Sequence, residues 1–195
     1  MKKTITILVI LIAFNCTAQE RTISVSMDKD QFYAIEFAEG DYFKDTENKY
    51  DIFTGTWEWT NGNSSFIIVL EKTEKVFDNF SKRYYDYVVG RYKYVQNSVE
   101  VVNTLDLVIN NNNMLIPGTI VPIMGRGYIS DTKMDFGVND ILKDKLCNAS
   151  FEILTQGSET TAKFMLWNKE HWNIDGENPL PDGFSIPTDI ILSKQ

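Results

Sequence analysis

The segment from Asp51 to Leu70, DIFTGTWEWTNGNSSFIIVL, constrains the fold more than any other part of the chain. From Phe53 onward, aromatic residues and glycine alternate with threonine and glutamate, which is the period-two pattern of a strand with one buried face. Asn61-Gly62 follows, and this dipeptide is typical of a type I′ turn, whose two central residues both need positive φ. The apolar run from Phe66 to Leu70 then fits a strand that is covered on both faces. The segment therefore predicts a β-hairpin over residues 53–72.

The segment from Tyr84 to Val95 repeats this plan with a longer strand. Aromatic and β-branched residues dominate it, as is typical of strands, and Gly90 in its middle indicates a bulge or a bend. A polar turn at 96–98 leads into the apolar run at 99–102, so we predict a second hairpin. The residues between the two hairpins, from Thr73 to Lys82, are interpreted as a polar link.

The last third of the chain indicates a third hairpin and a final strand. We expect the hairpin strands at 149–154 and 161–167, and an apolar strand at 190–192. Short helical turns are expected near the N-terminus, at 31–37. Closely spaced strands joined by tight turns predict an all-β fold, either an antiparallel sandwich or an antiparallel barrel.

The N-terminus has the pattern of a secretory signal. Lys2-Lys3 precedes an apolar core at 5–14, which is too short to span a membrane. Small residues place the expected cleavage after Ala18, so we predict an exported protein that is periplasmic or extracellular. The alternative is lipoprotein processing before Cys16, which would anchor the chain to a membrane, although Phe14 and Asn15 do not suit that signal.

The run from Asn48 to Trp57 resembles the first structural motif of the calycins, the group that includes lipocalins and avidins. Gly55 and Trp57 match the Gly-x-Trp of their first strand. This resemblance implies an antiparallel up-and-down (meander) β-barrel, lipocalin- or avidin-like, in which the tryptophan closes one end. The chain departs from the lipocalins, because it has no Thr-Asp-Tyr motif and no arginine after Arg126 that could cap Trp57 from the last strand.

The resemblance carries no ligand, because the polar biotin-binding positions of avidins find no match either. Over most of its length the chain more closely resembles a family of small exported bacterial proteins of unknown function. The signal, the GTWEW hairpin, the VVGRYKYVQNS segment and the C-terminal GFSIPTDIILSKQ carry that similarity. We therefore expect a signal peptide at 1–18, an N-terminal extension at 19–50 and a β-barrel domain at 51–195.

Charge and cysteine content narrow the possible partners. Removing residues 1–18 takes away two lysines and no acidic residue, so the formal net charge of −8 becomes −10. Such a charge opposes binding to nucleic acid and to anionic lipid, so nucleic acid is not expected as a partner, and a membrane is expected only if Cys16 is lipidated. Cys147 would be the only cysteine left, and we interpret it as a buried, small apolar residue rather than a reactive thiol.

Catalytic patterns are weak. His171 is the only histidine, which excludes a metal site built from several histidines, and no Gly-x-Ser-x-Gly segment is present. The carboxylate pairs Asp175 with Glu177 and Glu36 with Glu39 are expected by chance among 27 acidic residues. We therefore expect no enzymatic activity, no metal and no cofactor.

The aromatic residues indicate a binding function more strongly. In a barrel, the candidates Trp59, Tyr85, Tyr92 and Trp167 would line the interior or its mouth, where aromatic walls suit a small apolar or amphiphilic ligand. The alternative is that side chains fill the interior, as in many small barrels. The chain would then be a non-enzymatic interaction module with an unknown protein partner, using a sheet edge or the loop from Asp175 to Gly183.

Overall fold

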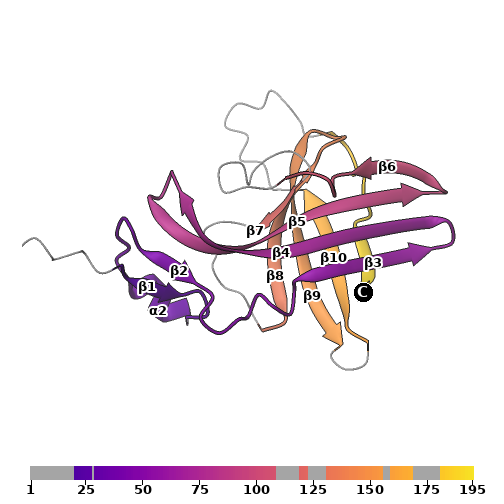
Figure 1. Ribbon diagram of the computed structural model, residues 1–195. Coiled ribbons are helices and arrows are strands. Elements are labelled where there is room, and N and C mark those ends of the chain that lie inside the picture. The colour runs from indigo at the N-terminus through magenta and orange to yellow at the C-terminus, as the bar shows by residue number, and fades with distance from the viewer. Residues whose placement is uncertain (1–19, 28, 109–118, 123–130, 156–158, 169–180) are drawn as a thin grey trace, which may run out of the picture.

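The computed structural model of the protein (Figure 1) describes residues 20–27, 29–108, 119–122, 131–155, 159–168 and 181–195. It contains one short helix, α2 (Lys29–Ala34), and eleven strands. The strands are β1 (Thr22–Ser24), β2 (Tyr42–Lys44), β3 (Gly55–Asn61), β4 (Ser64–Asp78), β5 (Arg83–Gln96), β6 (Val99–Asn103), β7 (Thr119–Pro122), β8 (Lys133–Asp140), β9 (Lys145–Thr155), β10 (Thr161–Asn168) and β11 (Asp189–Lys194).

All eleven strands belong to one mixed sheet. Its order is β1-β2-β5-β4-β3-β11-β10-β9-β8-β7, with β6 paired to β5 beside this path. The pairs β1–β2 and β2–β5 are parallel, and the other pairs are antiparallel. The predicted all-β class is confirmed.

The predicted meander barrel is not confirmed, because the sheet is not closed into a barrel. Among the described residues β3 and β11 share only two residue pairs, Trp57 with Lys194 and Glu58 with Ser193. β7 pairs with β8 through three residue pairs. It also pairs with β5, but through only two residue pairs. The rest of this edge of β5 pairs with β2 and β6, so the contact between β5 and β7 is short. Beyond these two seams, β3–β6 continue as a four-stranded section.

The first predicted hairpin is confirmed as β3 and β4, which pair from Gly55–Leu70 to Asn61–Ser64. Its turn lies one residue later than expected, because Asn61 still belongs to β3. Gly62 occupies the first central position with φ 58°, which is the pattern of a type II′ turn. Asn61 and Gly62 thus serve as the last strand residue and the turn glycine.

The second and third hairpins are also confirmed. β5 and β6 are joined by Asn97 and Ser98, whose φ values of 50° and 66° correspond to a type I′ turn. Of the bulge or bend expected at Gly90, the β4–β5 ladder excludes the bulge, since Gly90 pairs regularly with Leu70. Gly90 lies where three strands approach closely. β9 and β10 form the third hairpin, and β11 is the predicted final strand.

The polar link predicted from Thr73 to Lys82 was also wrong, because β4 continues to Asp78 and pairs with β5. Two residues of β4, Glu74 and Lys75, lie opposite the single residue Asp86 of β5, which makes a β-bulge. We call the part of this hairpin beyond the bulge, residues 76–85, the hairpin arm. In Figure 1 it extends away from the crossing strands β8–β10 toward β1, β2 and α2.

Aromatic side chains fill the core on the inner face of the sheet. Phe151 on β9 lies at its centre, with its ring centroid 4.9 Å from that of Trp57 and 6.4 Å from that of Phe136. These contacts are edge-to-face, which is a favoured aromatic geometry. Among the described residues, the fully buried aromatic side chains are Phe53, Trp57, Phe66, Tyr92, Phe136, Phe151 and Phe164.

We predict that Gly90→Ala destabilises the fold by about 1–3 kcal/mol, because overpacking a close contact costs energy of that order. A Cβ atom at Gly90 would lie 2.6 Å from Leu70 Cδ2 and 3.0 Å from Ile120 Cβ. Urea unfolding measures the change. Val99→Ala, at a side chain that is 65% exposed, is the control and should leave the midpoint nearly unchanged. Equal midpoints for the two variants would contradict the tight packing of β4, β5 and β7.

Candidate functional site

One row of side chains crosses the four-stranded section on its inner face. The strand register places Trp59 of β3 beside Phe66 of β4, Phe66 beside Tyr94 of β5, and Tyr94 beside Val102 of β6. We call these four residues the aromatic row. Phe66 and Val102 are buried, whereas Trp59 and Tyr94 are half-buried and pack against the core. The row therefore lies at the border between the core and the solvent.

The row just inside the aromatic row is fully buried. It contains Trp57, Ile68 and Tyr92, which are neighbours on β3, β4 and β5. The Tyr92 hydroxyl donates a hydrogen bond of 2.7 Å to the Asn139 carbonyl oxygen, and burial raises the pKa of Tyr92. Side chains thus fill the interior at this level, and a ligand would have to bind at the aromatic row rather than below it.

The four candidates from the sequence lie in three separate places. Trp59 and Tyr92 both flank Phe66, and the ring centroids of Tyr92 and Phe66 are 6.0 Å apart. Tyr85 lies in the hairpin arm, stacked between Phe43 at 4.9 Å and Tyr87 at 5.5 Å. Trp167 on β10 is 41% exposed and follows the buried Leu166, so it faces away from the core. The structure brings together only the first two.

The Gly-x-Trp segment has a specific local geometry. Gly55 has φ 114°, and a Cβ atom there would lie 3.1 Å from Lys194 Cε, so glycine suits this position on both counts. Trp57 Nε1 donates to the Phe53 carbonyl oxygen at 2.8 Å. Lys194 Nζ lies 5.2 Å from the Trp57 ring centroid and donates to the Ile52 carbonyl oxygen at 3.2 Å. Lys194, and not an arginine, is thus the cation that contacts Trp57 from the last strand.

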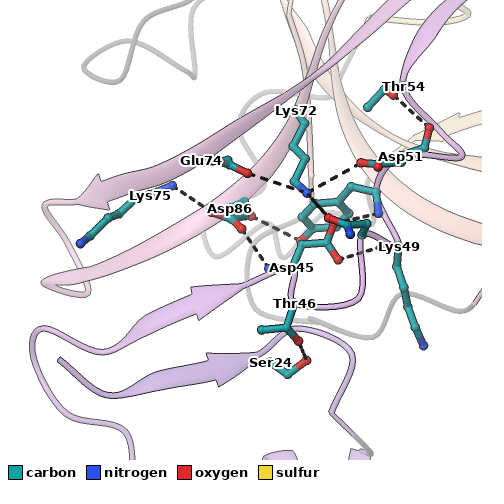
Figure 2. A network of polar contacts seen from close by, with 12 residues as sticks. Ser24, Asp45, Thr46, Lys49, Asp51, Thr54, Lys72, Glu74, Lys75 and Asp86 are labelled. Atoms are coloured by element: carbon teal, nitrogen blue, oxygen red, sulfur yellow. Dashed lines mark hydrogen bonds and ion pairs between the residues drawn. The ribbon is translucent and has the colours of Figure 1, made fainter. Parts of the chain in front are cut away.

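A buried polar network joins the N-terminal segment to the β4–β5 hairpin (Figure 2). The Asp86 side chain accepts hydrogen bonds from the Tyr42 hydroxyl at 2.6 Å, the Asp45 backbone N–H at 2.9 Å and the Lys75 backbone N–H at 2.9 Å. Burial, followed by the bond to Asp86, raises the pKa of Tyr42. The carboxylate therefore links β2, the residue after it and the bulge of β4.

The carboxylate of Asp45 extends this network. It accepts from the backbone N–H groups of Lys49 and Tyr50, at 2.8 and 3.1 Å, and forms an ion pair of 3.0 Å with Lys72 Nζ. The net effect of the surroundings is to raise the pKa of Lys72. Burial alone would lower this pKa, but the hydrogen bond to Asp45 and the negative charge of Asp45 have the larger combined effect. All of these donors belong to the chain itself, so the network stabilises the junction between the N-terminal segment and the β4–β5 hairpin. We call this network of Asp86 and Asp45 with their donors the structural lock. The sequence signal for it was Asp86, an acidic residue within an aromatic strand.

The remaining candidates add no site. Cys147 is buried, as predicted, and burial raises the pKa of its thiol to about 11. Glu36 and Glu39 are both exposed, and His171, Asp175 and Glu177 lie outside the described residues. In the described part of the chain, no group of three or more histidine, cysteine, aspartate or glutamate side chains is placed to hold a metal ion. None of the helices among those residues is long and apolar enough to cross a membrane.

The fold and these features define an all-β protein on one mixed sheet, with an aromatic inner face and a braced hairpin arm. The chain belongs to a family of unknown function (DUF6705), whose model matches residues 1–195. The resemblance to a family of unknown function is thereby confirmed, and the calycin-like motif is not. No curated protein and no solved structure matches the chain.

We predict that Asp86→Ala destabilises the protein by at least about 3 kcal/mol, because three donors lose their acceptor and unsatisfied buried groups cost about 1–3 kcal/mol each. Thermal and urea unfolding measure the loss. Asp189→Ala is the matched control, because this carboxylate is 64% exposed and pairs with Lys163 at the surface, where ion pairs contribute little. A similar stability for the two variants would show that the network is not a lock.

Proposed function

We propose that this chain is an exported, non-enzymatic binding protein that holds a small apolar or amphiphilic ligand against the aromatic row. The observation that carries the proposal is the position of Trp59 and Tyr94, half-buried on the inner face where β3 has separated from β11. At this level the described core leaves two aromatic side chains only partly covered. A flat ligand that stacked on them would extend the buried core outward.

The chemistry of the row favours a neutral or amphiphilic ligand. Its four side chains carry no formal charge, and the only polar atoms among them are the indole N–H of Trp59 and the hydroxyl of Tyr94. Aromatic walls with one or two polar groups are typical of sites that bind small apolar molecules. The acidic charge of the chain opposes anionic ligands and nucleic acid.

We also propose that the sheet is a calycin-type barrel that has opened beyond its two seams. Two observations support this relationship. The path of strand neighbours returns from β7 to β5, although through only two residue pairs. In addition, Lys194 covers Trp57 from the last strand, which is the role that the resemblance to lipocalins assigns to an arginine.

A second candidate function is a protein interaction module that uses the sheet as a scaffold. The observation that favours it is the near-complete exposure of Phe80 at the end of the hairpin arm. This candidate is independent of the aromatic row.

The ligand proposal predicts that mature protein purified gently from its own compartment carries a reproducible non-covalent adduct in native mass spectrometry. Trp59→Ala and Tyr94→Ala should each reduce adduct occupancy or affinity at least about tenfold, because each removes an aromatic wall. Trp167→Ala is the control, since that side chain is on the outer face, and should change nothing. A protein without an adduct, or equal loss in all three variants, would count against the site.

Export predicts a specific mature mass. The secreted protein should begin at Gln19 after cleavage behind Ala18, which intact-mass spectrometry of protein from the native host would show. A mass that corresponds to a diacylglycerol-modified N-terminal Cys16 would instead establish membrane anchoring. An uncleaved chain in the cytoplasm would overturn the proposal of export.

A further inference from the structure

A row of uncharged polar side chains borders the aromatic row on the inner face, on the side of the hairpin turns. Strand alternation puts the residue two positions beyond each ring of β3, β4 and β5 on the same face as that ring. These residues are Asn61, Ser64 and Gln96. We call them the polar row. Asn61 and Gln96 are exposed, and Ser64 is half-buried, so the inner face changes here from aromatic to polar within one step.

Most polar groups of the two rows have unused hydrogen-bonding capacity. Ser64 Oγ accepts from the Asn97 backbone N–H at 3.0 Å. The side-chain amides of Asn61 and Gln96 make no hydrogen bond to another described residue. Within the same part of the chain, the Trp59 indole N–H and the Tyr94 hydroxyl make none either. Each carboxamide offers two donors and an acceptor, so a ligand on the aromatic row would meet both kinds of partner at its edge.

The charged side chains of these strands lie on the opposite face. Lys93 precedes Tyr94 on β5, so alternation directs it outward, where its Nζ forms an ion pair of 2.8 Å with Glu100. Glu58 precedes Trp59 on β3 and is directed outward in the same way. The seven side chains of the two rows carry no formal charge. They therefore supply no cation of the kind that binds phosphate, sulfate or carboxylate groups.

The spacing of the two half-buried rings sets the length of the ligand. Trp59 is on β3 and Tyr94 on β5, with the buried Phe66 of β4 between them, 6.1 Å from Tyr94 between ring centroids. Two strand spacings amount to roughly 10 Å. Ile68 and Tyr92 fill the core just below, so a ligand would lie across the rings rather than enter a tunnel. This surface suits a flat ligand of two linked rings.

We propose that the ligand of the aromatic row is a neutral disaccharide unit, with one pyranose ring on Trp59 and the next on Tyr94. The inference rests on the proposed binding function and names its class of ligand. A pyranose has an apolar C–H face, which suits the negative face of an aromatic ring. It also has a rim of hydroxyl groups, each of which both donates and accepts. Stacking brings these hydroxyl groups to the amides of Asn61 and Gln96.

Two other classes of ligand fit these rows less well. A long alkyl chain needs an enclosed apolar pocket to bury its surface, and it has no polar groups for two carboxamides. An acidic sugar or a phosphate would lack a cation in either row and would meet the formal net charge of −8 of the chain. A neutral sugar uses both the aromatic surface and the amides beside it.

The test titrates the protein, as it is processed in its native host, with maltose, cellobiose, lactose and N,N′-diacetylchitobiose. Isothermal titration calorimetry measures affinity, and saturation-transfer difference NMR reports which ligand protons contact the protein. We expect at least one disaccharide to bind, with the strongest saturation at the C–H protons of one pyranose face, because stacking covers that face. The same disaccharide with a carboxylate in place of one primary alcohol should bind more weakly, since neither row holds a cation.

Variants locate the sugar on the two rows. Trp59→Ala should weaken binding at least about tenfold, and Trp59→Phe should weaken it less, because a smaller aromatic surface remains. Gln96→Ala should weaken binding about fivefold, the equivalent of one hydrogen bond. Thr60→Ala is the control, because Thr60 is exposed on the outer face of β3, and it should change nothing. Gln96 and Thr60 are both exposed, so unchanged thermal unfolding is required of these two variants.

N-phenylnaphthylamine, a neutral apolar fluorescent probe, separates the sugar inference from the proposed function. Binding of this probe that Trp59→Ala abolishes, with no binding of any disaccharide, would overturn the inference and leave the proposed function standing. Absence of binding by the probe and by all four disaccharides would overturn both. Undiminished sugar binding by Trp59→Ala and Gln96→Ala would also overturn the inference, because the sugar would then bind elsewhere.

Discussion

The buried carboxylate of Asp86 is the interaction on which the N-terminal half of the structure depends. Its donors come from β2, from the residue that follows β2 and from the bulge of β4. Strand β2 adds to β5 through only two parallel residue pairs, so backbone pairing alone fixes its position weakly. The hydrogen bonds of the Asp86 side chain fix the position of β2, which the short ladder alone does not. They also fix the bulge, and with it the direction of the hairpin arm.

Burying a carboxylate is costly, and the structure offsets this cost with a complete set of partners. Asp86 receives three donors, and the neighbouring Asp45 receives two backbone donors and Lys72. Apolar contacts reinforce the same junction, since the ring of Phe43 on β2 stacks on Tyr85 of β5. A fully satisfied polar network of this kind favours one arrangement of its segments, because any other arrangement leaves a buried group unpaired.

The hairpins could be predicted from the sequence because period two and turn residues are local signals, as in 53–72. The arm could not be predicted in this way. Its bulge places both Glu74 and Lys75 opposite one residue, Asp86, and so shifts by one residue the alternation of buried and exposed side chains along β4. The period-two pattern is therefore interrupted, and from the sequence alone the buried Val76 was placed in a polar link. The parallel pairing of β1 and β2 is non-local and has no short motif. For the site, alternation identified Trp59, but could not show that Trp167 faces outward.

The aromatic row and the tip at Phe80 lie at opposite ends of the same two strands (Figure 1). The pair Phe66–Tyr94 and the pair Phe77–Tyr84 are about ten residues apart, or roughly 35 Å along a strand. Regular ladder pairs and the core separate the two, and the bulge opposite Asp86 is the one irregularity that the register of β4 and β5 shows between them. Between Phe66 and the bulge the two strands keep regular ladder pairing, and the Asp86 carboxylate fixes the bulge by accepting from the backbone N–H of Lys75. The direction of the arm relative to the aromatic row is therefore set at the bulge.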